Sequence, residues 1–254
     1  MISRYEVILG GMALSAISPH IVILDVQHPP ASIRNGTYSL AKRQGAHVYR
    51  RYIESTSVTV SFMIRAYDIR ERQAILQQVV RWAKNGGVLQ TSDREGQQLR
   101  CICEQYPSVS SVRNWTDPLQ ITFAAHALPF WQEVLPATLS LTGTSGSGNL
   151  YVPGDADDAF VEATITANAA LSSLSLTAGD TSISLTGLSI ASGGTVVIAY
   201  DQDMIQSIRT GSTSLLSKRT GNDDLTVPSG EISAFSFTSD ANCTVAFSVR
   251  GLWL

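Results

Sequence analysis

The sequence predicts a mainly β protein with two domains and one long helix. Short runs in which apolar and polar residues alternate recur along most of the chain, and this alternation is typical of half-buried strands. Helical spacing of apolar residues is clearest in one segment, residues 69–84. The composition changes near residue 134, from an arginine-rich part to one rich in Ser, Thr, Gly and Ala. We therefore expect one domain at residues 1–133 and a second at residues 134–254.

The first domain is predicted to be a β-sandwich-like sheet with the helix packed on it. Its clearest strand has one apolar face, made by Val58, Val60, Phe62, Ile64 and Ala66. Further strands are expected at residues 88–91, 99–106 and 119–125. A turn is expected at residues 92–96, a hairpin or loop at 107–117, and the end of the domain at Pro129-Phe130-Trp131.

The predicted helix has both start and stop signals. Asp68 and Glu71 resemble a capping box, in which carboxylates accept hydrogen bonds from free backbone N–H groups. Gly86-Gly87 follows, where a left-handed residue commonly ends a helix. The apolar residues at helical spacing are Ile75, Leu76, Val79, Val80 and Ala83.

The second domain is predicted to be a β-sandwich or jelly roll of short strands. Residues 134–136 are expected to join the domains, and Gly143 to Gly148 (GTSGSG) to form a flexible turn. Gly179-Asp180 predicts a hairpin with glycine first. The expected strands are residues 160–166, 171–178, 182–186, 195–200, 205–209, 232–238 and 243–250.

The charge pattern favours an assembling subunit over a nucleic-acid binder. Charged residues make up 15% of the chain, against a usual value of about 25%, which suits extensive buried contacts between subunits. The net charge is −3, without the basic excess of nucleic-acid binders. Residues 1–136 carry 14 Lys and Arg and 10 Asp and Glu, whereas residues 137–254 carry 4 and 11. The two domains are therefore expected to meet different surroundings.

Neither the cysteines nor the N-terminus indicates a secreted protein. Cys101, Cys103 and Cys243 form no disulfide framework, and the first two are expected side by side on one sheet face as small buried residues. Arg4 and the apolar stretch at residues 7–16 superficially resemble a signal peptide, but Glu6 and two glycines argue against one. No stretch approaches the roughly 18 apolar residues of a membrane span.

The sequence contains no recognisable catalytic, cofactor or metal motif, so we expect the protein not to be an enzyme. The histidines are scattered and fit no paired-ligand spacing; they are His20, His28, His47 and His126. No nucleophile elbow or phosphate-binding glycine loop occurs. Three acidic patches raise the question of calcium, at Asp155-Asp157-Asp158, Asp201-Asp203 and Asp223-Asp224. Acidic turns at strand ends explain them better, because Asp bonds its own backbone there.

Three aromatic residues of the second domain leave carbohydrate binding as an alternative function. Tyr151, Tyr200 and Trp253 could form a platform on which sugar rings stack. Aromatic residues in a β domain are more often found in the core or at an interface.

The order of the segments resembles that of a known family, the distal tail proteins (Dit) of bacteriophages with long non-contractile tails. The N-terminal segments that carry the resemblance are the run ending at residues 42–46, the strand at 57–62, the helix at 73–82, the hairpin at 89–103, and residues 119–123 followed by Leu128-Pro129-Phe130-Trp131. Those of the C-terminal part are residues 187–190, 194–198, the turn at 227–231 and the closing strand at 247–254, with Arg250 and Trp253. Ser229 separates the Pro and Gly that are adjacent in the family's turn, and the first 20 residues match no family segment.

The resemblance implies a structural protein of the virion, at the distal end of a phage tail. Members of the family form a hexameric ring, in some cases two stacked rings, whose N-terminal domains enclose a channel for DNA. Their C-terminal domains are galectin-like and point outward. The implied partners are further copies of the chain, the tail tube protein, the tail-tip hub protein and a receptor-binding protein. Arg65 and Met63, on the polar side of their strand, are the candidates for ring contacts.

Overall fold

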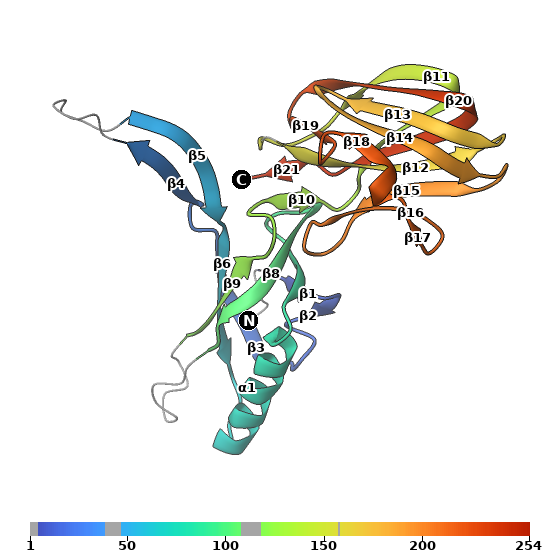
Figure 1. Cartoon of the computed structure of the whole chain (residues 1–254). Coiled ribbons are helices and arrows are strands. Elements are labelled where there is room, and N and C mark those ends of the chain that lie inside the picture. The colour runs from blue at the N-terminus through green and yellow to red at the C-terminus, as the bar shows by residue number, and fades with distance from the viewer. Residues whose placement is uncertain (1–4, 39–46, 108–117, 157) are drawn as a thin grey trace. The chain divides into compact units, whose positions relative to one another are not determined.

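The structure is a computed structural model that describes residues 5–38, 47–107, 118–156 and 158–254. The chain is mainly β and divides into two compact units (Figure 1). The N-terminal unit comprises residues 1–131 together with Leu254, and the C-terminal unit comprises residues 132–253. The predicted loop at residues 107–117 falls almost entirely outside the described residues, as do Asp157 and the run at residues 42–46.

An antiparallel sheet forms the body of the N-terminal unit, with the strand order β2-β1-β7-β8-β9-β6-β3. Its strands are β1 (Val7–Leu9), β2 (Met12–Ala13), β3 (Ile21–Gln27), β6 (Ser57–Ile64), β7 (Gly87–Thr91), β8 (Gln97–Gln105) and β9 (Leu119–Ala125). The five apolar residues predicted to form one face of β6 and its extension are fully buried. β1, β2 and β3 were not expected from the sequence, because these strands are short or apolar without alternation.

The helix α1 (Ile69–Ala83) confirms the predicted helix and ends one residue earlier than expected. Asp68 caps it by accepting a hydrogen bond from the N–H of Arg70. The second half of the predicted capping box is replaced by a contact with His20, since Glu71 lies 3.4 Å from its Nε2. Trp82 fixes the last turn, because its indole N–H donates to the carbonyl of Met12 and its ring packs edge-on against Phe123, with centroids 5.9 Å apart.

A second, two-stranded sheet belongs to the same unit. β4 (Ser32–Tyr38) and β5 (His47–Ser55) pair with each other in antiparallel fashion. Neither strand pairs with a third strand in the described part of the chain. Figure 1 shows this hairpin, in blue, extending away from the sheet and helix of its unit.

The C-terminal unit is an antiparallel sandwich built around one long strand. β20 (Ile232–Val249) pairs with β11 (Ala137–Tyr151) along almost its whole length. It also pairs with β13 through residues 235–239 and with β12 through residues 243–249. The rings of Phe235 and Phe247, from the two parts of β20, meet in the core with centroids 5.2 Å apart. The predicted strands 232–238 and 243–250 are therefore two parts of one strand.

The remaining strands extend the sandwich in the order β17-β16-β15-β12-β20-β13-β14-β18. They are β12 (Ala159–Ala167), β13 (Leu171–Ala178), β14 (Thr181–Ile190), β15 (Thr195–Tyr200), β16 (Gln206–Thr210), β17 (Thr213–Ser214), β18 (Arg219–Gly221) and β19 (Thr226–Val227), with a short 3-10 helix at Leu216–Lys218. The hairpin predicted at Gly179-Asp180 joins β13 to β14 and is confirmed. Two short strands lie at the start and end of the unit, β10 (Trp131–Glu133) and β21 (Leu252–Trp253).

The flexible turn predicted at Gly143 to Gly148 is wrong. These residues lie inside β11, with a bulge between Gly143 and Ser145. The glycines serve packing in this strand. A Cβ on Gly146 would lie 2.9 Å from the ring of Phe237, and one on Gly148 would lie 3.2 Å from a methyl carbon of Leu139. The glycine and serine content of this segment suggested a flexible turn. In the structure these glycines instead lie in a strand and leave space for neighbouring side chains.

Candidate interaction site

The four histidines occupy separate places and form no shared site. His20 contacts Glu71 and His28 contacts Asp93. His47 begins β5, and His126 lies exposed just after β9. Within the described ranges, no group of three His, Cys, Asp or Glu side chains is placed to hold a metal ion. In the same ranges, no helix has the length and apolar character that crossing a bilayer requires.

Two acidic patches act as turn and ion-pair residues. Oδ1 of Asp201 accepts hydrogen bonds of 2.9 Å from the N–H groups of Asp203 and Ile205. Asp223 lies 2.8 Å from the guanidinium of Arg219. The third patch is described in part, because Asp157 lies outside the described residues. The structural role that the sequence analysis preferred over calcium binding is confirmed for Asp201.

The two neighbouring cysteines are held as neutral thiols. Cys101 is buried, and this burial, together with the nearby Cys103, raises the pKa of its thiol to about 12. Burial also raises the pKa of Cys103. Thiolates are the nucleophilic and metal-binding form of cysteine. Cys101 thus has the buried packing role that was predicted, whereas Cys103 is only partly buried.

The aromatic residues considered for sugar binding do not form a common platform. Tyr200 is buried, and its ring packs edge-on against Phe160 with centroids 4.9 Å apart. Its hydroxyl accepts a hydrogen bond from Gln206 and another from the N–H of Leu225. Trp253 donates its indole N–H to Glu133 at 2.8 Å, whereas Tyr151 is exposed. Because Tyr200 is buried, a sugar could stack on at most two of the three rings.

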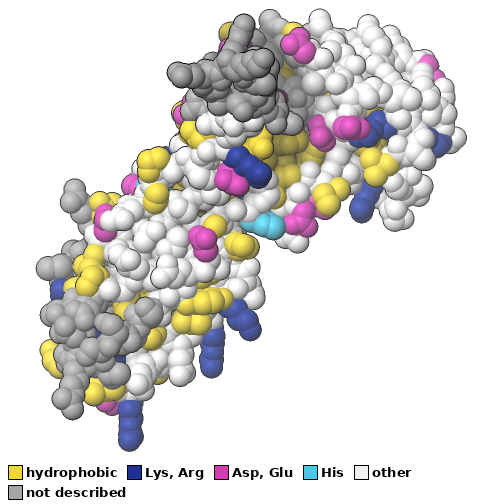
Figure 2. All heavy atoms as spheres, turned by 60° about the vertical axis from the view of Figure 1, so that its left-hand side comes forward, with side chains coloured by type: hydrophobic (Ala, Val, Ile, Leu, Met, Phe, Trp, Pro, Cys, Tyr) yellow, Lys and Arg dark blue, Asp and Glu magenta, His cyan; other side chains and the backbone are white. Residues whose placement is uncertain are grey.

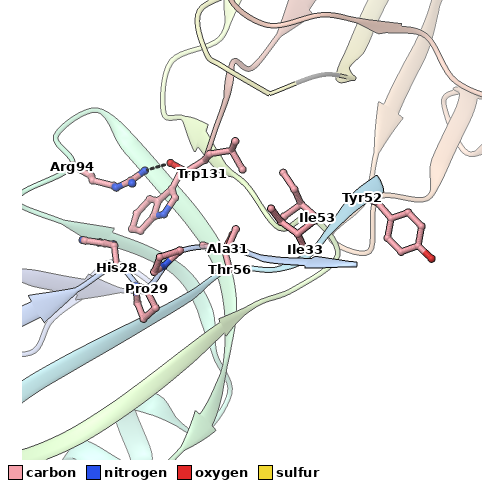
Figure 3. Close-up of a pocket in the computed structure, with 11 residues that line it drawn as sticks. His28, Pro29, Ala31, Ile33, Tyr52, Ile53, Thr56, Arg94 and Trp131 are labelled. Atoms are coloured by element: carbon pink, nitrogen blue, oxygen red, sulfur yellow. Dashed lines mark hydrogen bonds between the residues drawn. The ribbon is translucent and has the colours of Figure 1, made fainter. Parts of the chain in front are cut away.

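An apolar pocket of about 540 Å³ lies in the N-terminal unit, at the root of the β4–β5 hairpin. Figure 3 shows Ile33 and Ile53 side by side on the hairpin, facing the pocket, while Tyr52 points away from it. Ile33 and Ile53 are direct cross-strand partners. The full lining is His28, Pro29, Pro30, Ala31, Ile33, Tyr52, Ile53, Thr56, Arg94, Trp131 and Leu254.

Polar groups fix the inner wall of this pocket. Nε2 of His28 lies 2.6 Å from a carboxylate oxygen of Asp93, and its ring packs edge-on against the buried Trp131. Arg94 lies over the other side of this indole, 5.1 Å from the ring centroid, and donates a hydrogen bond to the main-chain oxygen of Leu254 at 3.0 Å (Figure 3). The wall is therefore a rigid stack on both sides of Trp131.

The His28–Asp93 pair orders this wall, and no Ser or Cys is among the residues that line the pocket. Burial raises the pKa of Asp93, but the nearby Thr91 side chain, the hydrogen bond with His28 and the charge of His28 outweigh burial, so the pKa lies below its ordinary value. Thr56 has the only hydroxyl among the lining side chains apart from that of Tyr52, and it donates to the carbonyl of Pro129. The pocket thus suits an apolar group of a partner protein. The scattered spacing of the histidines gave no sign of a role for His28, and the pocket was not predicted, although Pro29-Pro30 marks an extended segment there.

No protein-family model and no curated protein matches the sequence. Solved structures do match the fold over nearly the whole chain. The Dit protein of phage SPP1, described as a paradigm of the hub adsorption apparatus in phages that infect Gram-positive bacteria, matches with a TM-score of 0.72. The match has 10% identity and covers 98% of this chain and 99% of the other. The chain has a Dit-like fold.

Two further matches of the Dit-like fold are chains of the phage P2 baseplate in its activated conformation. The structure with Ca matches at a TM-score of 0.55 and 10% identity, covering 99% of this chain and 98% of that one. The structure with Sr also matches at a TM-score of 0.55 and 10% identity, and the match covers 97% of each chain. Both units of the Dit-like chain are included in all three matches. The resemblance found in the order of the sequence segments is therefore confirmed at the level of the fold.

Proposed function

We propose that the chain is a structural subunit of a bacteriophage tail, located in the virion at the distal tail tip. It forms a hexameric ring that joins the tail tube protein to the tail-tip hub and leaves a channel for DNA. Residues 1–133 make the ring, and the galectin-like domain at residues 134–254 points outward and carries further adsorption proteins. The observation that carries the proposal is the Dit-like fold, which extends over 98% of the chain and 99% of the SPP1 Dit protein.

The β4–β5 hairpin supports assembly on independent physical grounds. An isolated two-stranded hairpin is marginally stable in water. The contacts on its surface add little, because the ion pair between Arg34 and Glu54 is exposed and 3.8 Å long. Ile33 is 46% exposed and Tyr52 40% exposed. A neighbouring subunit that covers this hairpin would bury these side chains and complete the strand pairing.

The side chains that could perform chemistry also favour a structural role. Each described cysteine is either buried or has a thiol with a raised pKa. The His28–Asp93 pair has no Ser or Cys beside it among the residues that line the pocket. Tyr200 is part of the core. Figure 2 shows a surface on which charged side chains are scattered singly or in small groups. A protein that assembles through apolar and backbone contacts needs no large charged patch.

The test is the mass of the full-length protein in solution, measured by light scattering behind a sizing column, with negative-stain images of the main peak. We expect annular particles of six subunits or a multiple of six. Replacing Ile33 with Asp should break the ring contact, since a charge would enter an apolar interface. Arg34→Gln is the matched control on the same strand and should leave the mass unchanged.

A wild-type protein that stays monomeric over a wide concentration range would contradict the ring. Glycan-array screening then tests the carbohydrate-binding alternative. Binding that is lost on Tyr151→Ala or Trp253→Ala would favour this second function.

A further inference from the structure

The strand β11 has a free outer edge. β11 pairs with β20 on one side, and none of the described strands pairs with its other side. None of its fifteen residues is buried, and exposure alternates along the strand. An edge of this kind presents a row of unpaired backbone N–H and C=O groups and is a template for another strand.

Proteins usually protect such edges with charged residues, prolines or short strands. The other two ends of the strand order show this protection. β17 has two residues and β18 has three, and Lys218 donates a hydrogen bond to the carbonyl of Gly187 on β14. β11 is different, because residues 137–151 contain no charged residue and no proline.

The first half of β11 is complementary to itself. Leu139 and Leu141 point inward and are only partly buried, because no strand lies beyond them. Thr138, Ser140 and Thr142 point outward and are exposed. If two copies of this segment pair antiparallel around Ser140, Leu139 of one copy faces Leu141 of the other, and Thr138 faces Thr142. Every side chain then stays on its own face, as strand register requires, and both cross-strand pairs join similar side chains.

We propose that residues 137–143 pair with the same segment of a second copy of this chain, around a two-fold axis at Ser140. The pairing continues the sheet β15-β12-β20-β11 of one subunit into that of the other. Such an isologous contact differs from the head-to-tail contacts that close a ring. Where the rings close, this contact therefore joins a subunit of one ring to a subunit of another. The contact does not depend on ring closure, so it also forms between two single subunits.

The first test replaces Ser140 with Lys in the full-length protein and measures the mass by light scattering. Two lysines would face each other at the axis, and like charges directly opposite destabilise a strand pair. We expect the mass to fall by a factor of two, from twelve to six subunits or from two to one. Ser147→Lys is the matched control, because Ser147 is an exposed serine on the other half of the same strand. It should keep the wild-type mass.

A second pair of variants tests the register. Thr138→Lys with Thr142→Lys places like charges opposite each other in the proposed pairing and should halve the mass. Thr138→Lys with Thr142→Glu places opposite charges there and should keep the wild-type mass. Mixing Ser140→Lys with Ser140→Glu protein should likewise restore the doubled mass, which excludes misfolding as the cause of dissociation.

The outcomes separate this contact from the ring. A wild-type mass of six subunits or one, or a Ser140→Lys protein with the mass of the wild type, would overturn the proposal. A wild-type dimer that Ser140→Lys converts to a monomer would support it and contradict the ring. Ile33→Asp should reduce a double ring to the β11-paired dimer, and the combination with Ser140→Lys should give monomers.

Discussion

At the scale of single residues, Gly86 has a conformation and a location that no other residue can adopt without strain. Its φ is +62°, and a Cβ there would lie 2.3 Å from the carbonyl oxygen of Cys101 on β8. The turn after α1 can therefore approach the sheet only if residue 86 lacks a side chain.

We expect Gly86→Ala to lower the free energy of unfolding by about 2–4 kcal/mol, from backbone strain plus the clash with backbone atoms. Gly96→Ala is the matched control, because Gly96 also has a positive φ of +80° but has open space where a Cβ would be. It should cost about 1 kcal/mol. Urea unfolding of both variants measures the difference. Equal decreases in the free energy of unfolding would show that the close approach to Cys101 does not contribute to the cost.

Asp93 gives the pocket wall a dependence on pH. A carboxyl with a lower pKa in the folded state than in the unfolded state stabilises the fold above its unfolded pKa, which is about 3.9. This contribution is lost as the pH falls through the lower folded-state pKa. Since the pKa of Asp93 is lowered, Asp93→Asn should melt at a lower temperature than the wild type at pH 7. The difference should shrink as the pH falls below the unfolded pKa of about 3.9, and a difference independent of pH would contradict this role.

At the scale of elements, the long central strands distinguish the C-terminal unit from a set of short hairpins. β11 contains three glycines between residues 143 and 148 that would normally indicate a loop, yet it pairs with β20 on both sides of its bulge. Hydrogen exchange should therefore find protected amides between residues 145 and 151. The bend at Asp223 and Asp224 is the internal control and should exchange quickly. Equally fast exchange in both segments would show that residues 145–151 form a loop.

The same elements show how far the sequence could predict this fold. Helix α1 could be found because its cap, its apolar spacing and the following glycines all agree. The two parts of β20 were found as separate strands, because the polar segment between them, residues 239–242, is typical of a turn, and β11 pairs with β20 only on either side of it. The pocket could not be predicted, since His28, Arg94 and Trp131 are brought together only by the pairing of distant strands.

At the scale of the whole molecule, the two units have separate hydrophobic cores. Trp131, Phe62 and Phe123 are buried in the N-terminal unit, whereas Phe235, Phe237 and Phe247 are buried in the C-terminal unit. A fragment of residues 132–253 should therefore fold alone. Its unfolding should be a single cooperative transition, followed by near-ultraviolet circular dichroism. A fragment without fixed aromatic signals would show that the C-terminal unit depends on the N-terminal one.

The entry and exit of the C-terminal unit lie side by side. The N–H of Glu133 donates to the carbonyl of Gly251, and Ala137 pairs with Val249. A unit attached through adjacent ends can be removed, enlarged or exchanged for another without rethreading the rest of the chain. During evolution, different modules can therefore be attached at this junction while the N-terminal unit stays the same.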